Sequence, residues 1–140
     1  VIVGMGNLGR ALVGHLGTAE RPFRVVAAVD KDPAKVGTAV ADLTIRPQGD
    51  LATIVAETGA DIGVLAVPAE VAQENYDALV TAGVRSILNF APAHLRRAPG
   101  VRTKNVDVRI PLEELGFFLR CREAAGAGTA SPEADCSELG

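Results

Sequence analysis

The chain has 140 residues, of which 48% are hydrophobic and only 4% aromatic, and its formal net charge is −3. This length gives one domain, and a core built from Val, Leu, Ile and Ala suits a parallel sheet with helices on both faces. The acidic balance argues against nucleic-acid binding by these residues themselves. No apolar run approaches the roughly 20 residues that span a bilayer. The two cysteines form no metal-ligand cluster, so we expect a reduced, cytoplasmic setting and no metal.

The most informative segment is residues 1–9, where a short apolar run leads into three glycines. The spacing G-x-G-x-x-G between a strand and a helix is typical of dinucleotide-binding folds. The first glycine permits a tight turn, the second lets the backbone approach a pyrophosphate, and the third lets the helix pack close to the sheet. The N–H groups and positive dipole end of that helix would face the phosphates. We therefore expect a cofactor to be bound by Gly4, Met5, Gly6, Asn7, Leu8 and Gly9.

The apolar run before Gly4 is shorter than a strand buried on both faces usually has, and it begins with Val. We therefore expect the chain to start partway into its first strand, with residues missing upstream. After the motif, an apolar helix face follows over residues 11–16.

An acidic residue follows the second expected strand, which covers Phe23–Val29 and ends at Asp30. A carboxylate in this position can accept hydrogen bonds from both hydroxyls of an adenine ribose, and it would repel a 2′-phosphate. Lys31 alone would favour a phosphate, but it lies between Asp30 and Asp32. We therefore expect NAD(H) and not NADP(H). The alternative is an ordinary βαβ turn followed by a chance acidic residue.

The rest of the chain alternates strands and helices. Pro33 is expected to open a short turn or helix that Gly37 ends. Further strands are expected over 44–46, 62–67, 84–90 and 101–108. Helices are expected over 51–58, capped by Asp50, and over 69–82, preceded by Pro68. This alternation predicts an α/β fold with right-handed crossovers, and six strands match the doubly wound parallel sheet of a Rossmann fold, in the order 3-2-1-4-5-6. Residues 1–108 would form this domain.

Two segments follow that a minimal Rossmann domain does not need. Within residues 109–123 we expect a helix whose apolar side chains spread over an unusually wide arc, namely Leu112, Leu115, Phe117, Phe118 and Leu119. Such a helix is either buried on the chain's own sheet or docked on a second subunit. Residues 124–140 are rich in Gly, Ala, Ser, Pro and acidic residues, and we expect them to be disordered.

Several of these segments resemble one known family. They are Gly-Met-Gly-Asn-Leu-Gly-Arg-Ala-Leu (4–12), Val-Asp-Lys-Asp-Pro-Ala-Lys-Val-Gly (29–37), Val-Pro-Ala-Glu-Val-Ala-Gln (67–73) and Ile-Leu-Asn-Phe-Ala-Pro (87–92). Together with Asn-Val-Asp (105–107) and the helix after it, they resemble the nucleotide-binding half of the Rex family, the redox-sensing transcriptional repressors of bacteria. The Ile-Leu-Asn-Phe-Ala-Pro stretch is the most specific, because generic dehydrogenases do not share it.

The resemblance implies a homodimer that binds NADH or NAD⁺ and changes its affinity for operator DNA with the NADH/NAD⁺ ratio. It implies that the helix within 109–123 is swapped across the dimer. It also implies that Asp107 helps to sense the ligand, whereas Val108 stands where relatives can carry an aromatic residue. The winged-helix DNA-binding domain of the family precedes the Rossmann domain and is absent here, so DNA binding would belong only to a longer protein. The expected surroundings of the nicotinamide are Val67, Pro68, Asn89, Phe90, Ala91 and Pro92.

Two other functions remain open: an NAD-dependent oxidoreductase fragment, and a coenzyme A-binding Rossmann domain such as that of the succinyl-CoA ligase α subunit. A dehydrogenase needs a substrate pocket and a placed acid or base, but only about 50 residues follow the fifth strand, too few for a typical substrate domain. His94 is expected to be a loop residue, and Tyr76 has no Lys four positions on. We therefore expect no catalytic residue and no enzyme. Asp30 argues against the phosphorylated adenosine of coenzyme A.

Overall fold

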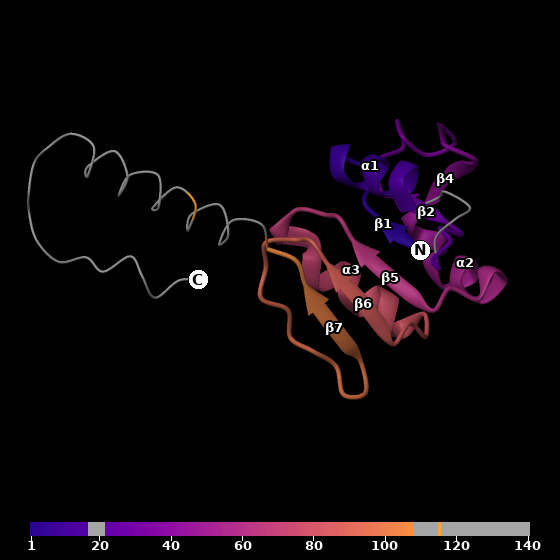
Figure 1. The fold of residues 1–140 in the computed structure, drawn as a ribbon. Coiled ribbons are helices and arrows are strands. Elements are labelled where there is room, and N and C mark those ends of the chain that lie inside the picture. The colour runs from indigo at the N-terminus through magenta and orange to yellow at the C-terminus, as the bar shows by residue number, and fades with distance from the viewer. Residues whose placement is uncertain (17–21, 108–114, 116–140) are drawn as a thin grey trace, which may run out of the picture. The chain divides into compact units, whose positions relative to one another are not determined.

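The structure is a computed structural model that describes residues 1–16, 22–107 and 115. It divides into two compact units, Val1–Val106 and Asp107–Gly140. Figure 1 shows the first unit as an α/β fold. The helix expected within 109–123 and the tail expected over 124–140 lie outside the described residues, apart from Leu115.

A seven-stranded sheet forms the centre of the first unit, in the order β3-β4-β2-β1-β5-β6-β7 (Figure 1). The strands are β1 (Ile2–Val3), β2 (Ala28–Asp30), β3 (Ala39–Val40), β4 (Leu43–Pro47), β5 (Ile62–Leu65), β6 (Ser86–Asn89) and β7 (Arg102–Asn105). All neighbouring strands pair in parallel except β3 and β4. Without β3, the order along the sheet is the expected 3-2-1-4-5-6. The doubly wound Rossmann fold is therefore confirmed.

The structure corrects three local expectations. The edge strand β3 pairs antiparallel with β4 across a turn in which Ala41 has a φ of 47°, and its two residues are too few to show periodicity in the sequence. Strand β2 begins at Ala28 and not at Phe23, whose side chain is 56% exposed. Asp50 stands at the start of the next helix, but its side chain makes no capping hydrogen bond. Its backbone (φ −91°, ψ 9°) ends a 3₁₀ turn and lacks the extended conformation of a typical cap.

Helices cover both faces of the sheet. They are α1 (Asn7–Leu16), η1 (Gln48–Asp50), α2 (Leu51–Thr58) and α3 (Ala69–Thr81). Because side chains alternate along a strand, β1 and the residue before it divide between two cores. Val1 and Val3 pack with Ile54 of α2 and Leu79 of α3, whereas Ile2 packs with the α1 side. Helices α2 and α3 therefore cover one face, and α1 covers the other.

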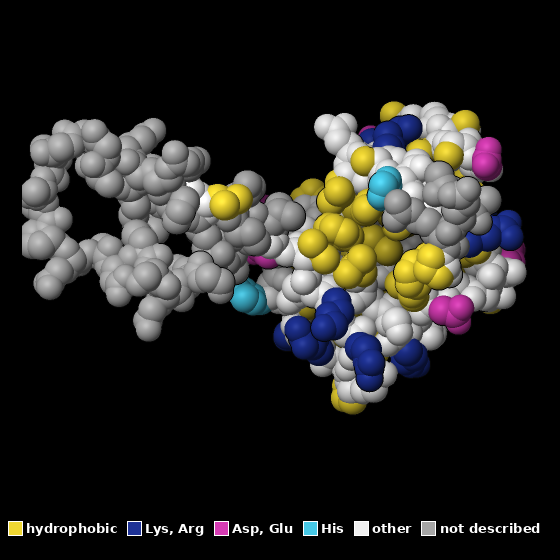
Figure 2. Space-filling view, viewed as in Figure 1, with side chains coloured by type: hydrophobic (Ala, Val, Ile, Leu, Met, Phe, Trp, Pro, Cys, Tyr) yellow, Lys and Arg dark blue, Asp and Glu magenta, His cyan; other side chains and the backbone are white. Residues whose placement is uncertain are grey.

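The face with α1 leaves several apolar side chains only partly covered. The apolar side chains that are only partly buried against its core are Leu12, Val25, Leu43, Leu88 and Phe90. Figure 2 shows hydrophobic side chains gathered in the middle of the visible face, with Lys and Arg side chains below them. Within the described residues, no helix is long and apolar enough to cross a membrane.

Candidate functional site

The glycine-rich turn between β1 and α1 has the close packing that the motif predicts. Gly4 has a φ of +96°, and a Cβ there would overlap the carbonyl oxygen of Ala66 and lie 2.8 Å from Cγ1 of Val67. A Cβ on Gly9 would overlap the carbonyl oxygen of Gly4. Around Gly6, in contrast, a Cβ would meet nothing within 4 Å. Gly4 and Gly9 are therefore required by the fold itself, whereas Gly6 leaves space that a ligand could use.

Asp30 lies at the carboxyl end of β2, and its carboxylate is held on both oxygens. The backbone N–H of Met5 donates to Oδ2 (2.7 Å), and that of Asp32 donates to Oδ1 (2.8 Å). The Nζ of Lys35 also lies 3.3 Å from Oδ2 and forms an ion pair. The bond from Met5 ties the acidic residue directly to the glycine-rich turn.

The environment of Asp30 keeps it ionised. Burial acts to raise the pKa of this carboxyl, because it removes water from the charged form. The two backbone hydrogen bonds, and then Lys35, act in the opposite direction and outweigh burial, so the pKa lies below its usual value. A fixed anionic acceptor therefore stands at the edge of the glycine-rich turn.

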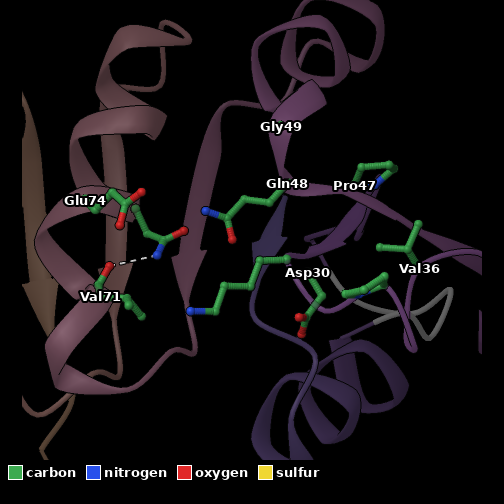
Figure 3. A pocket seen from close by; sticks show the side chains of 10 residues that line it. Asp30, Val36, Pro47, Gln48, Gly49, Val71 and Glu74 are labelled. Atoms are coloured by element: carbon green, nitrogen blue, oxygen red, sulfur yellow. Dashed lines mark hydrogen bonds between the residues drawn. The ribbon is translucent and has the colours of Figure 1, made fainter.

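A cavity lies at the carboxyl ends of β1, β2, β4 and β5, which is where open α/β sheets bind ligands. We refer to it as the strand-end cavity. One part, of about 550 Å³, is lined by Gly4, Gly6, Asp30, Lys31, Asp32, Pro33, Lys35, Gln48, Ala66, Val67, Pro68, Val71 and Asn75. The other part, of about 500 Å³, shares several of these residues and adds Val36, Pro47, Gly49 and Glu74. Figure 3 shows Val71 and Glu74 of α3 facing Asp30 and Gln48 across this second part.

The strand-end cavity brings together six of the residues expected from the sequence: Gly4, Gly6, Asp30, Lys31, Val67 and Pro68. Four others from the glycine-rich segment do not line it. Met5 is fully buried and contributes its backbone N–H to Asp30, while Gly9 is buried in the first turn of α1. Asn7 and Leu8 are exposed on the first turn of α1.

The expected nicotinamide residues at the end of β6 and in the loop after it form a separate local structure and do not line the cavity. The side chain of Asn89 is 1% exposed and accepts a hydrogen bond from the N–H of Ala91 (3.0 Å). Its Nδ2 donates to the carbonyl oxygen of Ala91 and to Oδ1 of Asn105, both at 3.2 Å. Phe90 and Pro92 therefore belong to a loop that Asn89 holds in place beside the end of β5, since Asn89 pairs with Leu65. His94 lies exposed in the same loop, as expected.

Asp107 opens the second unit, and Leu115 in that unit is 61% exposed. The expected role of Asp107 in sensing stays a prediction. Among the described residues, no group of His, Cys, Asp and Glu could hold a metal ion.

The sequence did not identify Lys35, Gln48, Val71 or Asn75 as site residues. Lys35 reaches Asp30 because a turn follows β2, with the N–H of Lys35 bonded to the carbonyl of Asp32 (3.0 Å). Gln48 follows β4, whose strand end lies beside that of β2. Val71 and Asn75 are four positions apart on α3, so they share one helix face. The sequence signal that indicates these two residues is their spacing of four in the helix that follows Val67-Pro68.

Comparisons with known proteins identify the family of the chain. The family model described as CoA binding domain matches residues 1–93. The redox-sensing transcriptional repressor Rex of Streptomyces coelicolor is 46% identical over 137 residues, which cover 96% of this chain and 53% of that protein. The chain thus spans about half the length of this curated relative.

Two solved structures of RSP, a Rex-family repressor, are also similar to the chain. The complex with NADH superposes with a TM-score of 0.81 at 28% identity and covers 91% of this chain and 62% of RSP. The complex with NAD⁺ and operator DNA superposes with a TM-score of 0.79 at 28% identity and covers 92% of this chain and 61% of RSP. The chain therefore belongs to the CoA-binding domain family, and the resemblance to the Rex family of redox-sensing repressors is confirmed.

Proposed function

We propose that this chain binds NAD(H) in the strand-end cavity and is the nucleotide-sensing part of a redox-sensing transcriptional repressor. The observation that carries the proposal is Asp30, an ionised acceptor fixed at the end of β2 and bonded to the glycine-rich turn. The pyrophosphate would lie over the glycine-rich turn, where Gly6 leaves open space, and the adenine ribose would lie against Asp30. The relatives of this chain, described as redox-sensing repressors, support the same function.

The geometry refines how Asp30 would hold the ribose. A carboxylate offers about four acceptor positions, and three of those on Asp30 already receive hydrogen bonds from Met5, Asp32 and Lys35. Only one acceptor position is therefore open, and the second ribose hydroxyl must replace one of the three existing donors. The bond from Lys35 is the longest of the three at 3.3 Å, and this side chain is the one that can move away. Lys35 would then yield to the second hydroxyl while the two backbone bonds stay.

Coenzyme A is the second candidate ligand, because the matching family model is described as a CoA binding domain. Coenzyme A and NADP(H) both carry a phosphate on the adenosine ribose, next to where we place Asp30. A buried, ionised carboxylate repels that phosphate. Lys31 and Lys35 lie nearby, but Lys35 is already paired with Asp30. We therefore propose NAD(H) and expect both phosphorylated nucleotides to bind weakly.

The proposed regulator acts through parts beyond the described residues. Operator DNA would be bound by a winged-helix domain in a longer protein, in the cytoplasm, and this chain would not be an enzyme. We propose a homodimer held by the helix within 109–123, in which Leu115 is 61% exposed. The partly covered apolar face of the first unit also offers area to a partner. Truncation after Pro111 should give a monomer or an aggregate in sedimentation velocity, whereas a stable truncated dimer would place the interface elsewhere.

Discrimination between NAD⁺ and NADH must come from the nicotinamide end, since the two ligands share adenosine and pyrophosphate. The surroundings proposed for this ring, Val67-Pro68 and the loop after Asn89, are mostly apolar. Burying a cationic ring there costs desolvation energy that the neutral ring avoids, and a tenfold preference for NADH needs only about 1.4 kcal/mol. Neutral nicotinamide would then favour a closed dimer, with Asp107 reporting closure. Equal affinities by calorimetry, unchanged in Asp107→Ala, would contradict this mechanism.

Titration of the full chain with NADH, NADPH and coenzyme A tests the ligand. We expect NADH to bind best, and Asp30→Ala to weaken NADH binding by roughly 1–3 kcal/mol, the scale of lost hydrogen bonds to a charged group. The matched control is Asp42→Ala, which removes the same charge from an exposed turn outside the strand-end cavity and should leave binding unchanged. Equal affinity for NADH and NADPH, or tighter binding of coenzyme A, would refute the proposal.

A further inference from the structure

Asn75, in the middle of α3, carries a polar atom without a partner. The side chain is 1% exposed, and its Nδ2 donates to the backbone carbonyl of Val71 at 2.7 Å. Its Oδ1 is buried and accepts no hydrogen bond, and it is the one buried side-chain nitrogen or oxygen in this condition among the described residues. Buried polar groups are nearly always paired in folded proteins, so this oxygen calls for an explanation.

Helix structure explains only half of this side chain. A polar residue inside a helix often bonds back to the carbonyl four positions earlier, and the bond from Nδ2 to Val71 is such a contact. That contact accounts for the amide nitrogen and leaves the carbonyl oxygen unused. An apolar residue of the same size would fill this position without burying an unpaired acceptor.

Asn75 is also part of the strand-end cavity. It lines both parts of it, opposite the strand ends that carry Asp30 and Gln48. In Figure 3 the dashed line marks the bond to Val71, on the α3 side of the cavity. Because Nδ2 is bonded to Val71, only small turns of the amide about its soft last torsion are open to Oδ1, and a donor must approach it from the cavity. The missing partner can therefore be supplied by a ligand.

The chemistry of the wall indicates which part of the ligand this is. If Asp30 holds the ribose, the base extends into the part of the cavity lined by Val36, Pro47 and Val71, whose apolar surfaces suit a flat ring. The polar edge of adenine carries a 6-amino group that donates hydrogen bonds. A purine with a carbonyl oxygen at position 6 presents an acceptor there instead. Two acceptors would then face each other, and no hydrogen bond to Oδ1 would form at that position.

We propose that Asn75 is a specificity-determining residue that accepts a hydrogen bond from the 6-amino group of adenine. This inference rests on the proposed binding of NAD(H). Through this hydrogen bond the protein would recognise the polar edge of the base in addition to its shape. It also explains why an acceptor is kept where the fold alone would be better served by an apolar side chain.

The test compares NADH with reduced nicotinamide hypoxanthine dinucleotide, in which a carbonyl oxygen replaces the 6-amino group. The wild-type chain should bind the hypoxanthine analogue about tenfold more weakly, the effect of one unmade hydrogen bond. In Asn75→Leu the affinity for NADH should fall about tenfold while that for the analogue changes little, so the two become nearly equal. The melting temperature of the free variant should not fall, because an unpaired buried oxygen has been removed.

Gln73→Leu is the matched control, since it also replaces a side-chain amide of α3 with leucine, at a residue that does not line the cavity. It should keep the wild-type preference for NADH over the analogue. Equal binding of both ligands by the wild-type chain would overturn the inference even if Asn75→Leu failed to fold. An unchanged preference in Asn75→Leu would overturn it as well. If the wild-type chain bound no NADH at all, the proposed function would fail together with the inference.

Discussion

Two glycines of the same turn should respond in opposite ways to alanine. At Gly4, alanine must adopt a φ of +96°, which costs roughly 1–2 kcal/mol for a residue with a Cβ. The added Cβ also overlaps Ala66 and presses on Val67, and such overpacking costs about 1–3 kcal/mol. We therefore expect Gly4→Ala to lower the free energy of unfolding by roughly 2–5 kcal/mol. For a domain this is a large part of a total of about 5–15 kcal/mol.

At Gly6 the same substitution meets nothing within 4 Å, and the φ is not in the left-handed region. Stability should stay the same or rise by up to about 1 kcal/mol, because alanine restricts the unfolded chain. The methyl group would, however, occupy the space in the strand-end cavity where we place the pyrophosphate. We expect the dissociation constant for NADH to rise at least tenfold, or about 1.4 kcal/mol.

Urea denaturation followed by circular dichroism measures the first effect, and NADH fluorescence titration measures the second. With a slope of about 2 kcal/mol per molar urea, Gly4→Ala should shift the midpoint by roughly 1–2.5 M, while the midpoint for Gly6→Ala should not fall. The reasoning is refuted if Gly6→Ala binds NADH normally. It is equally refuted if Gly4→Ala unfolds at the wild-type midpoint.

Three further outcomes are expected. The folded pKa of Asp30 lies below its unfolded value of about 3.9, so its stabilising effect is present above that pH and is lost as pH falls through the folded pKa. The difference in urea midpoint between wild type and Asp30→Asn should accordingly shrink below about pH 4, and a constant difference down to pH 2 would contradict it. Lys35→Met should leave NADH affinity unchanged or raise it, because Lys35 competes with the ribose for Oδ2; calorimetry showing a loss as large as that of Asp30→Ala would contradict this. Tyr76→Phe should destabilise the fold by about 1 kcal/mol, because the N–H of Ala98 loses its acceptor at 3.0 Å; an unchanged urea midpoint would contradict that value.

The order of the sheet could be predicted because it depends on local signals that repeat along the chain. The glycine-rich turn, the alternation of strands and helices, and the acidic residue after the second strand determine the fold class between them. Strand β3 could not be predicted in this way, because two residues held by one turn carry no periodic pattern. Phe23 misled the prediction for a related reason. An apolar run shows which residues can be buried, but not which of them the sheet reaches.

The candidate site was only half predictable, because a cavity collects residues from segments that are distant in the sequence. Gly4, Gly6 and Asp30 belong to a motif with fixed spacing, so the sequence identifies them. Gln48 directly follows β4, and Asn75 lies in the second turn of α3. They line the same cavity because parallel strands end at one edge of the sheet and α3 begins at that edge, after β5. Lys35 was missed because its contact with Asp30 depends on the shape of a turn.

Asn89 has a consequence for how a signal could leave the nicotinamide end. One side chain contacts the loop after β6 at Ala91 and the last residue of β7 at Asn105, while its backbone carbonyl receives the N–H of Val106. Val106 is the final residue of the first unit. Asn89 therefore connects the loop after β6 with the segment in which the chain leaves the sheet, at Asn105 and Val106. A ligand that shifts the loop would strain these hydrogen bonds unless the chain's exit from the sheet moved with it, and the second unit follows that exit along the chain.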